Sequence, residues 1–330
     1  RTYGRLKPVL HTEAGNFSWL FVAFVVKKPS VCVAVKEIST NLMQDAGVFN
    51  PALGEILFML QIIPEIISSL QNPRIKQIVK WRDRADRDSD QVVLIEGYRA
   101  LLRALAGGYP VQEVYICPEL FQGDNEEALL ERLQQQGARI YQVSAPAFCK
   151  MAYRDRPEGL LGIGAQRHRT LQELPVPDKP GFFLVTEQIE KPGNLGTIMR
   201  SADAVQVDGL ILCDSRTDLF NPNVVRASTG NLFTLPIAEA GSAEAIAWLK
   251  ASGVQIYVAS PHVDELYTEI DMTVPLAIVV GAEQFGLSKS WLDAADRKLR
   301  LPMLGEADSL NVATATALLL YECVRQRLAA

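Results

Sequence analysis

The C-terminal half of the chain alternates short apolar runs with amphipathic stretches. Strands are predicted at residues 182–186, 209–213, 255–260, 276–280 and 298–301. Several of them are continuous apolar runs, which indicate parallel strands that are covered on both faces. Helical periodicity predicts helices near residues 196–205, 243–251 and 310–327. This alternation predicts an α/β domain over residues 181–330 that is built on a parallel sheet.

A smaller α/β domain is predicted upstream, over residues 65–165. A turn at residues 68–73 opens it, and a helical stretch follows to residue 87. Strands are then predicted at residues 91–96, 111–117 and 139–143, alternating with helices at residues 98–106 and 126–136. Residues 166–180 contain several prolines among polar residues, which predicts a linker between the two domains.

Residues 1–64 differ from the rest of the chain. Prolines interrupt their apolar runs, and no sustained strand or helix period joins them. We interpret them as an N-terminal extension, disordered or non-native, with the natural start near Met43 or Met59. The alternative is a small extra subdomain. The longest apolar run, residues 17–26, is shorter than the roughly 20 residues that span a bilayer, so no membrane anchor is expected.

Composition narrows the class of protein. The 330 residues are 48% hydrophobic and 22% charged, which is typical of a globular chain of about two domains. The five cysteines are scattered without a CxxC pair, and the three histidines are not clustered. We therefore expect a reducing, cytoplasmic location and neither a disulfide framework nor a metal site. The net charge of −5 means that any surface for nucleic acid must be local.

Three segments that follow predicted strands carry polar residues and glycines. Ligands of open α/β sheets lie beyond the carboxyl ends of the strands, so these segments are candidate binding loops. The first contains Asn194, Gly196 and Arg200; the second contains Gly281, Glu283 and Gly286; the third contains Pro302, Ser309, Leu310 and Asn311. Gly281 is expected to let a ligand approach the backbone closely.

Each segment by itself also has an ordinary structural explanation. Asn194 is a suitable helix cap, which would leave Arg200 solvated. The second segment fits a plain glycine turn with Glu283 exposed. In the third, a helix that starts at Ser309 and is capped by Asp308 or Ser309 leaves Asn311 in the first turn, where capping does not explain it.

Taken together, the three segments resemble the three motifs of the SpoU (TrmH-like) RNA ribose 2′-O-methyltransferases of the SPOUT superfamily. The resemblance covers about 150 C-terminal residues and extends to residues 68–165, which look like the family's substrate-binding domain, an α/β fold related to ribosomal RNA-binding proteins. It implies a trefoil-knotted methyltransferase domain, S-adenosylmethionine as methyl donor, and a homodimer. It further implies a donor site formed by Ser260, Gly281, Leu301, Met303, Leu310 and Asn311.

The resemblance also assigns catalytic residues: Arg200, Asn194, Glu283, Ser309 and Asn311. The arginine that Arg200 matches is usually described as the general base for the ribose hydroxyl. A guanidinium titrates above about 12 and stays protonated, and a nearby phosphate favours that state further. We therefore expect Arg200 to bind a phosphate bidentately and to stabilise developing alkoxide charge. Glu283 would orient Arg200 or Asn194, while Ser309 and Asn311 would position the ribose or the donor.

Two regions of the smaller domain are modestly basic. Residues 74–103 hold eight Lys or Arg against five acids, and residues 150–169 hold five against two. Such patches suit RNA phosphates, although solvated helix faces give the same counts. The candidate RNA contacts are Arg74, Lys76, Lys80, Arg99, Arg154 and Arg226.

The sequence thus predicts a methyltransferase acting on RNA ribose, with ribosomal (23S) RNA as the expected substrate. Transfer RNA is the nearest alternative, and a ribosome methylase conferring antibiotic resistance is a subtype that stays open. A non-catalytic RNA-binding or assembly factor would be expected to lack Asn194, Arg200, Glu283 or Asn311, and all are present. A nicotinamide dehydrogenase would need a GxGxxG loop, but the GxG at Gly162 and Gly164 has no third glycine.

Overall fold

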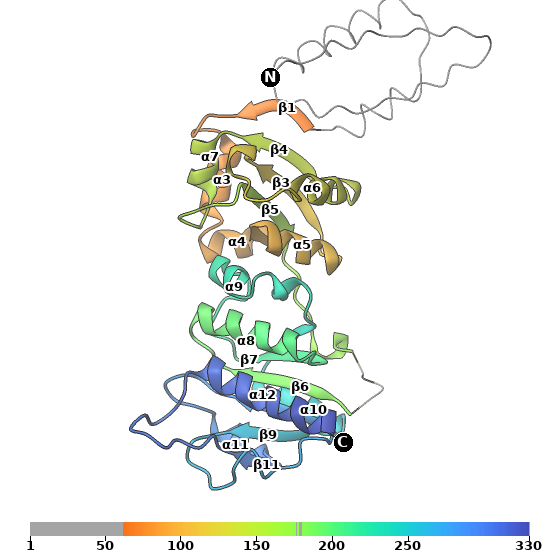
Figure 1. The fold of residues 1–330 in the computed structure, drawn as a ribbon, viewed down its shortest axis with the longest axis vertical. Coiled ribbons are helices and arrows are strands. Elements are labelled where there is room, and N and C mark those ends of the chain that lie inside the picture. The colour runs from red at the N-terminus through yellow and green to blue at the C-terminus, as the bar shows by residue number, and fades with distance from the viewer. Residues whose placement is uncertain (1–61, 176, 178–179, 330) are drawn as a thin grey trace, which may run out of the picture. The chain divides into compact units, whose positions relative to one another are not determined.

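The computed structural model describes residues 62–175, 177 and 180–329. The predicted N-terminal extension, residues 1–64, therefore lies outside the described residues except for its last three. Those three belong to the first strand of the smaller domain, which starts at Ile62. The described part contains two sheets, one in each predicted domain (Figure 1).

The first sheet has five strands in the order β1-β4-β3-β5-β2. Parallel pairs join β4 to β1 and to β3, whereas β5 runs antiparallel to both of its neighbours, β3 and β2. The strands are β1 (Ile62–Ile67), β2 (Val92–Glu96), β3 (Val111–Ile116), β4 (Arg139–Val143) and β5 (Leu160–Ala165). The predicted strands at 91–96, 111–117 and 139–143 are confirmed to within one residue, and β5 is an addition.

The helices of the smaller domain include one correction. The helical stretch predicted up to residue 87 is two helices, because the Asp83 side chain accepts a hydrogen bond from Ala85 N and starts a second helix. Helices α5 and α6 are as predicted to within one residue. The helices are α3 (Pro73–Lys80), α4 (Arg84–Asp90), α5 (Tyr98–Ala106), α6 (Glu126–Gln135) and α7 (Ala145–Met151), with a 3₁₀ turn, η1 (Pro118–Leu120).

The second sheet is wholly parallel, with strand order β11-β9-β10-β6-β7-β8. All five predicted strands are present, and the short β8 is added at its edge. The strands are β6 (Phe182–Glu187), β7 (Gly209–Cys213), β8 (Ile237–Ala240), β9 (Gln255–Ala259), β10 (Leu276–Val280) and β11 (Arg297–Leu299).

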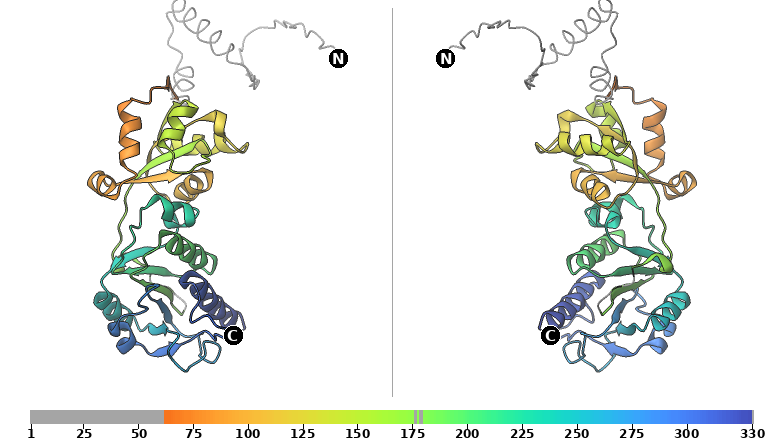
Figure 2. Two further views of the ribbon diagram at one scale, coloured as in Figure 1. Left: turned by 90° about the vertical axis from the view of Figure 1, so that its left-hand side faces the viewer. Right: turned by 90° about the vertical axis from the view of Figure 1, so that its right-hand side faces the viewer.

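Helices cover both faces of this sheet. They are α8 (Pro192–Ala204), α9 (Pro222–Ala227), α10 (Ser242–Ala251), α11 (Lys289–Ala294) and α12 (Val312–Ala329), with 3₁₀ turns η2 (Leu171–Glu173) and η3 (Asn231–Phe233). Figure 2 shows α12 and α10 on opposite sides of the sheet. The described helices include none that is long and apolar enough to cross a membrane.

Strand residues alternate between two apolar cores. Phe182 and Leu184 of β6 point into one core, and Phe183 and Val185 point into the other. Because both faces are buried, the strand reads as a continuous apolar run, which is why the sequence revealed it. The first of these cores also contains Val93 of β2, so it extends without interruption into the smaller domain.

The two domains are joined by buried polar contacts as well as by this core. Arg87 is 1% exposed, forms an ion pair with Asp218, and donates to the carbonyl oxygens of Trp81 and Arg82. The Tyr109 ring meets the Phe233 ring edge-on, with centroids 4.8 Å apart. Burying an ion pair of this kind is favourable only when most of its remaining hydrogen bonds are made. Both terminal nitrogens of Arg87 have partners, whereas its Nε is buried without one in the described part of the chain.

The predicted linker at residues 166–180 is packed over its described part. Leu171 and Leu174 are buried in the second core, and the backbone and side chains of Thr170 and Glu173 cap η2. The segment between the two domains is thus anchored to the second sheet by these two leucines.

Candidate active site

The loops that follow β9, β10 and β11 meet at one edge of the second sheet. These three strands are neighbours and run parallel, so their carboxyl ends lie together. Ser260, directly after β9, donates its backbone N–H to Leu299 O at the end of β11, at 3.0 Å. Strand β6 lies on the other side of β10, which brings the segment that leads into α8 to the same edge.

Gly281 and Gly286 form the tight loop that follows β10. The backbones of Ala282 and Gly286 exchange two hydrogen bonds, at 3.0 and 3.1 Å. A Cβ atom on Gly281 would lie 2.3 Å from the carbonyl of Gly286. The close approach predicted at Gly281 is thus made, within the described residues, by the chain's own backbone, and Gly286 has a positive φ of 65°.

Asn194, Glu283 and Asn311 form a connected side-chain cluster. Asn194 Nδ2 donates to Glu283 Oε1 at 2.6 Å, and Asn311 Nδ2 donates to Asn194 Oδ1 at 3.1 Å. Each of the three predicted motifs contributes one member. Both functional atoms of the Asn194 amide are engaged, so its orientation is set by its two neighbours.

The Glu283 carboxylate is held as an anion. Burial raises its pKa, but hydrogen bonds from the Asn194 side chain and from the backbone N–H groups of Glu283, Glu190 and Lys191 outweigh burial, so the pKa lies below its ordinary value. The Glu190 N–H donates to Glu283 Oε2 at 3.2 Å. A charged acceptor makes stronger hydrogen bonds than a neutral one, which favours a rigid cluster.

Both helix starts at this edge differ from the predicted ones. Helix α8 starts at Pro192, so Asn194 lies within its first turn and is not its cap. Helix α12 starts at Val312 rather than at Ser309, and Asn311 caps it by accepting from Ala313 N at 2.9 Å. Capping thus accounts for part of the role of Asn311. Its side-chain oxygen caps α12, and its side-chain nitrogen donates to Asn194.

Arg200 and Ser309 lie apart from the cluster contacts. Arg200 is exposed on α8 and makes no hydrogen bond or ion pair with another described residue. Of the two partners predicted for Glu283, Arg200 and Asn194, the structure shows the contact with Asn194. Ser309 is exposed in the loop before α12, two residues from Asn311.

The residues predicted for the donor site lie in these loops. Gly281, Leu301 and Met303 are half-buried, and Leu310 is 38% exposed. Phe285 and Leu304, in the loops after β10 and β11, are 71% and 98% exposed.

Two supporting acids were missed in the sequence. Glu190 carries the N–H that binds Glu283, and its side chain pairs with Arg216 at 2.5 Å. Glu187 is 3% exposed, and its carboxylate accepts from Ser288 N at 2.7 Å and from Ser242 Oγ at 3.2 Å, fixing the end of the loop that follows β10. An acid that ends an otherwise apolar strand was the available signal.

The predicted RNA contacts fall into separate places. Arg74 pairs with Glu113 and lies 4.4 Å from the Tyr141 ring centre, whereas Lys76 and Lys80 are exposed on α3. Arg99 and Arg154 line one cavity, and Arg226 is exposed on α9. Part of the basic count is structural, because Arg82, Arg87 and Arg103 donate to the protein itself.

Comparison with known proteins gives two family matches. Residues 181–321 match the SpoU rRNA Methylase family, and residues 72–162 match the MRM3-like substrate binding domain. The chain is 30% identical over 255 residues to the 23S rRNA (guanosine(2553)-2′-O)-methyltransferase RlmP of Bacillus subtilis, covering 77% of this chain and 97% of that protein.

Two further relatives agree with these matches. A 23S rRNA (uridine(2479)-2′-O)-methyltransferase of Streptomyces viridochromogenes is 32% identical, over 71% of this chain and 83% of that protein. The crystal structure of an AdoMet-bound rRNA methyltransferase from Sinorhizobium meliloti aligns with a TM-score of 0.73 at 31% identity, over 80% of this chain and 98% of that one. The chain belongs to the SpoU rRNA methylase family.

Proposed function

We propose that this protein transfers a methyl group from S-adenosylmethionine to a ribose 2′-oxygen of ribosomal RNA. The observation that carries the proposal is the Asn194–Glu283–Asn311 cluster, which unites all three motifs at the carboxyl edge of a parallel sheet. The named relatives RlmP and the Streptomyces enzyme methylate 23S rRNA, which favours ribosomal over transfer RNA.

The loops at this edge fit S-adenosylmethionine. Leu301, Met303 and Leu310 offer apolar surface for an adenine ring. When bound, the donor supplies a methyl group on a positively charged sulfonium. The described residues contain no group of three or more His, Cys, Asp or Glu that would hold a metal ion, and the proposal needs none.

The residues of the chain then act on the RNA. Glu283, kept ionised, holds Asn194, and Asn194 and Asn311 together join α8 to the start of α12. Arg200, exposed and without a partner in the described part, binds an RNA phosphate and stabilises the negative charge that develops on the 2′-oxygen as its proton passes to a water molecule. Ser309, in the loop before α12, contacts the ribose.

A homodimer completes the proposal. Helix α12 leaves Leu318, Tyr321 and Leu328 exposed at 42, 54 and 84%, and the spacing of these residues places them on one face. A second copy of the chain would cover this face. The trefoil knot stays a prediction from the resemblance, and the cytoplasmic location stays a prediction from the scattered cysteines.

The direct test is methyl transfer. Purified protein is incubated with tritiated S-adenosylmethionine and, separately, with ribosomal RNA and transfer RNA from a strain that lacks the gene. We expect label in ribosomal RNA within an alkali-resistant dinucleotide, which marks 2′-O-methylation. Label only in transfer RNA would overturn the substrate, and label in neither would overturn the proposal. Sedimentation of the same preparation measures the dimer.

A further inference from the structure

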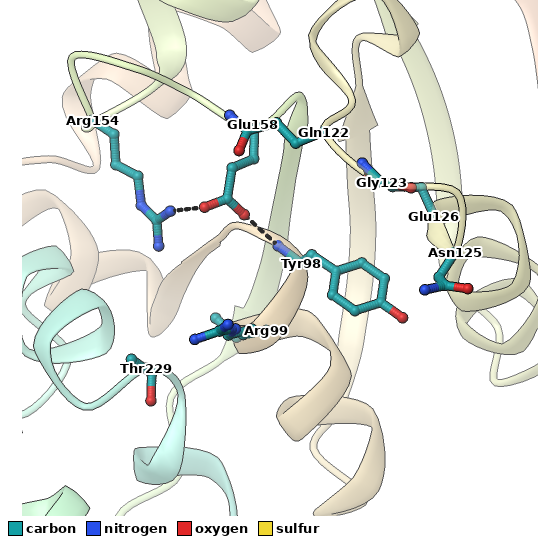
Figure 3. A pocket seen from close by; sticks show the side chains of 10 residues that line it. Tyr98, Arg99, Gln122, Gly123, Asn125, Glu126, Arg154, Glu158 and Thr229 are labelled. Atoms are coloured by element: carbon teal, nitrogen blue, oxygen red, sulfur yellow. Dashed lines mark hydrogen bonds and ion pairs between the residues drawn. The ribbon is translucent and has the colours of Figure 1, made fainter.

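A cavity of about 430 Å³ lies in the smaller domain, apart from the cluster of Asn194, Glu283 and Asn311. Figure 3 shows the side chains that line it. Its wall combines an aromatic ring, two arginines, two amides and one residue of the larger domain: Tyr98, Arg99, Gln122, Asn125, Arg154 and Thr229. Aromatic rings and arginines around a concave site are what unpaired RNA bases require.

The two acids of the cavity are already engaged. Glu158 Oε2 accepts from Tyr98 N at 3.1 Å, and its other oxygen pairs with Arg154. Glu126 Oε1 accepts from Gly123 N at 2.8 Å, and Glu126 is only 5% exposed. The hydrogen bond between Tyr98 N and Glu158 requires a glycine at position 97, because a Cβ atom on Gly97 would lie 2.9 Å from Glu158 Oε2.

Three polar side chains of the cavity have no partner within the described part of the chain. Among the described residues, the side chains of Arg99, Gln122 and Asn125 make no hydrogen bond or ion pair, and all three residues are exposed. The Tyr98 side chain packs partly against the core, and in Figure 3 its ring points away from Glu158, toward the side where Asn125 is drawn. The cavity therefore offers one ring face, one unpaired cation and two unpaired amides.

Thr229 connects the cavity to the larger domain. It lies in the left-handed region at φ 52°, and Arg103 donates to its carbonyl oxygen at 2.6 Å. The segment just before it is pressed against α8, because a Cβ atom on Gly196 would lie 2.7 Å from Ser228 N. A ligand in the cavity thus touches the turn that packs against the helix carrying Arg200.

We propose that this cavity binds a single unpaired nucleotide of the RNA substrate. The base stacks on Tyr98, the amides of Gln122 and Asn125 contact its polar edge, and Arg99 binds the adjoining phosphate. This inference rests on the proposed function and deepens it, since it states that the RNA must present a base outside a helix. Stacking on an aromatic side chain tolerates different bases, so the cavity selects for an unpaired nucleotide more than for a particular base.

The test compares two labelled RNA hairpins of the same stem, one fully paired and one with a single bulged 2-aminopurine. Wild-type protein is expected to bind the bulged hairpin about 5- to 150-fold more tightly, the range that one stacked base supplies. Tyr98→Ala should bring the affinity ratio near one, and Tyr98→Phe should preserve it. Lys76→Ala, an exposed cation outside the cavity, should weaken both hairpins equally and keep the ratio.

The inference is overturned if wild type shows no preference for the bulge, or if Tyr98→Ala keeps the wild-type ratio while its thermal melting matches wild type. Fluorescence of the 2-aminopurine gives a second readout, because stacking on Tyr98 changes its quenching in wild type and in Tyr98→Phe but not in Tyr98→Ala. Methyl transfer to ribosomal RNA is scored separately in the same preparations. Transfer without a bulge preference removes this inference alone, whereas absence of transfer removes the proposed function.

Discussion

Asn194 donates its side-chain amide to Glu283 at 2.6 Å, although 89 residues of chain separate the two. The contact exists because β10 pairs with β6, so the loop after one strand lies beside the segment after the other. Asn311 completes the arrangement from the opposite side of Asn194. This relationship supports specific expectations about activity and stability.

Asn194→Asp should disable the site more than its small size change suggests. The new carboxylate would face Glu283 across a distance at which the amide now donates a hydrogen bond, so attraction becomes repulsion. We expect methyl transfer to fall by about 100-fold or more. Tritium transfer from S-adenosylmethionine measures this, with Asn223→Asp on α9 as the matched control. Near wild-type transfer by Asn194→Asp would contradict a role for the cluster.

The contribution of Glu283 to stability should depend on pH with a defined sign. Its folded pKa lies below the ordinary value of about 4.5, so the ionised carboxylate stabilises the folded state fully above that pH. The contribution is lost as the pH falls through the lowered pKa. The difference in melting temperature between wild type and Glu283→Gln should be full at pH 7 and shrink below about pH 4.5. A difference that is constant with pH would contradict the charged cluster.

Arg200 variants separate binding of a phosphate from proton removal. Arg200→Ala should lose about 100-fold in transfer, and Arg200→Lys about tenfold, because lysine keeps the charge but not the bidentate fork. A general-base role predicts instead that the lysine variant gains rate as the pH rises toward its own pKa. Since Arg200 is exposed, the free energy of unfolding of both variants should lie within about 0.5 kcal/mol of that of wild type.

Two glycines of α8 form a matched pair. A Cβ atom on Gly196 would lie 2.4 Å from Ala227 Cβ, whereas one on Gly193 meets nothing within 4 Å. Gly196→Ala should therefore cost about 1–3 kcal/mol by forcing α8 away from α9. Gly193→Ala should be neutral or stabilise by up to about 1 kcal/mol. Urea unfolding measures both, and equal effects would show that the α8–α9 contact is not tight.

The buried pair of Arg87 and Asp218 should behave as a unit. Removing either partner leaves an uncompensated charge, so Arg87→Ala and Asp218→Ala should each cost about 3–5 kcal/mol. The double variant Arg87→Met/Asp218→Leu should recover most of that loss. Chemical denaturation of the single and double variants checks the coupling. Additive single effects would mean that the two residues act independently.

The sequence predicted elements wherever burial and chain periodicity agree. Strand β7 and helix α5 were predicted at their observed bounds, since their apolar positions face a core. Strand β5 was missed because Gly162 and Gly164 interrupt its apolar pattern, and its antiparallel pairing depends on two distant neighbours. The short α9 was missed because its six residues carry too little periodic signal.

In the candidate site, too, the sequence predicted which residues take part but not the contacts that depend on the tertiary structure. Motif order identified Asn194, Glu283 and Asn311, but their mutual hydrogen bonds require the strand order, which no local pattern encodes. The start of α12 was placed at Ser309 because several residues there are good caps, and the contact with Asn194 selects Asn311 among them. The sequence left Arg200 and Asn194 as alternative partners of Glu283, and the structure pairs Glu283 with Asn194 while Arg200 lies exposed on α8.

One apolar core runs from the first sheet into the second, and Arg87 fixes the joint between them. The cavity at Tyr98 and the cluster at Asn194 are therefore held a set distance apart by the protein itself. An RNA that occupies both must carry its unpaired nucleotide and its methylated ribose at a matching separation. The enzyme would then recognise its target by the distance between two sites on a folded RNA as much as by the identity of any base.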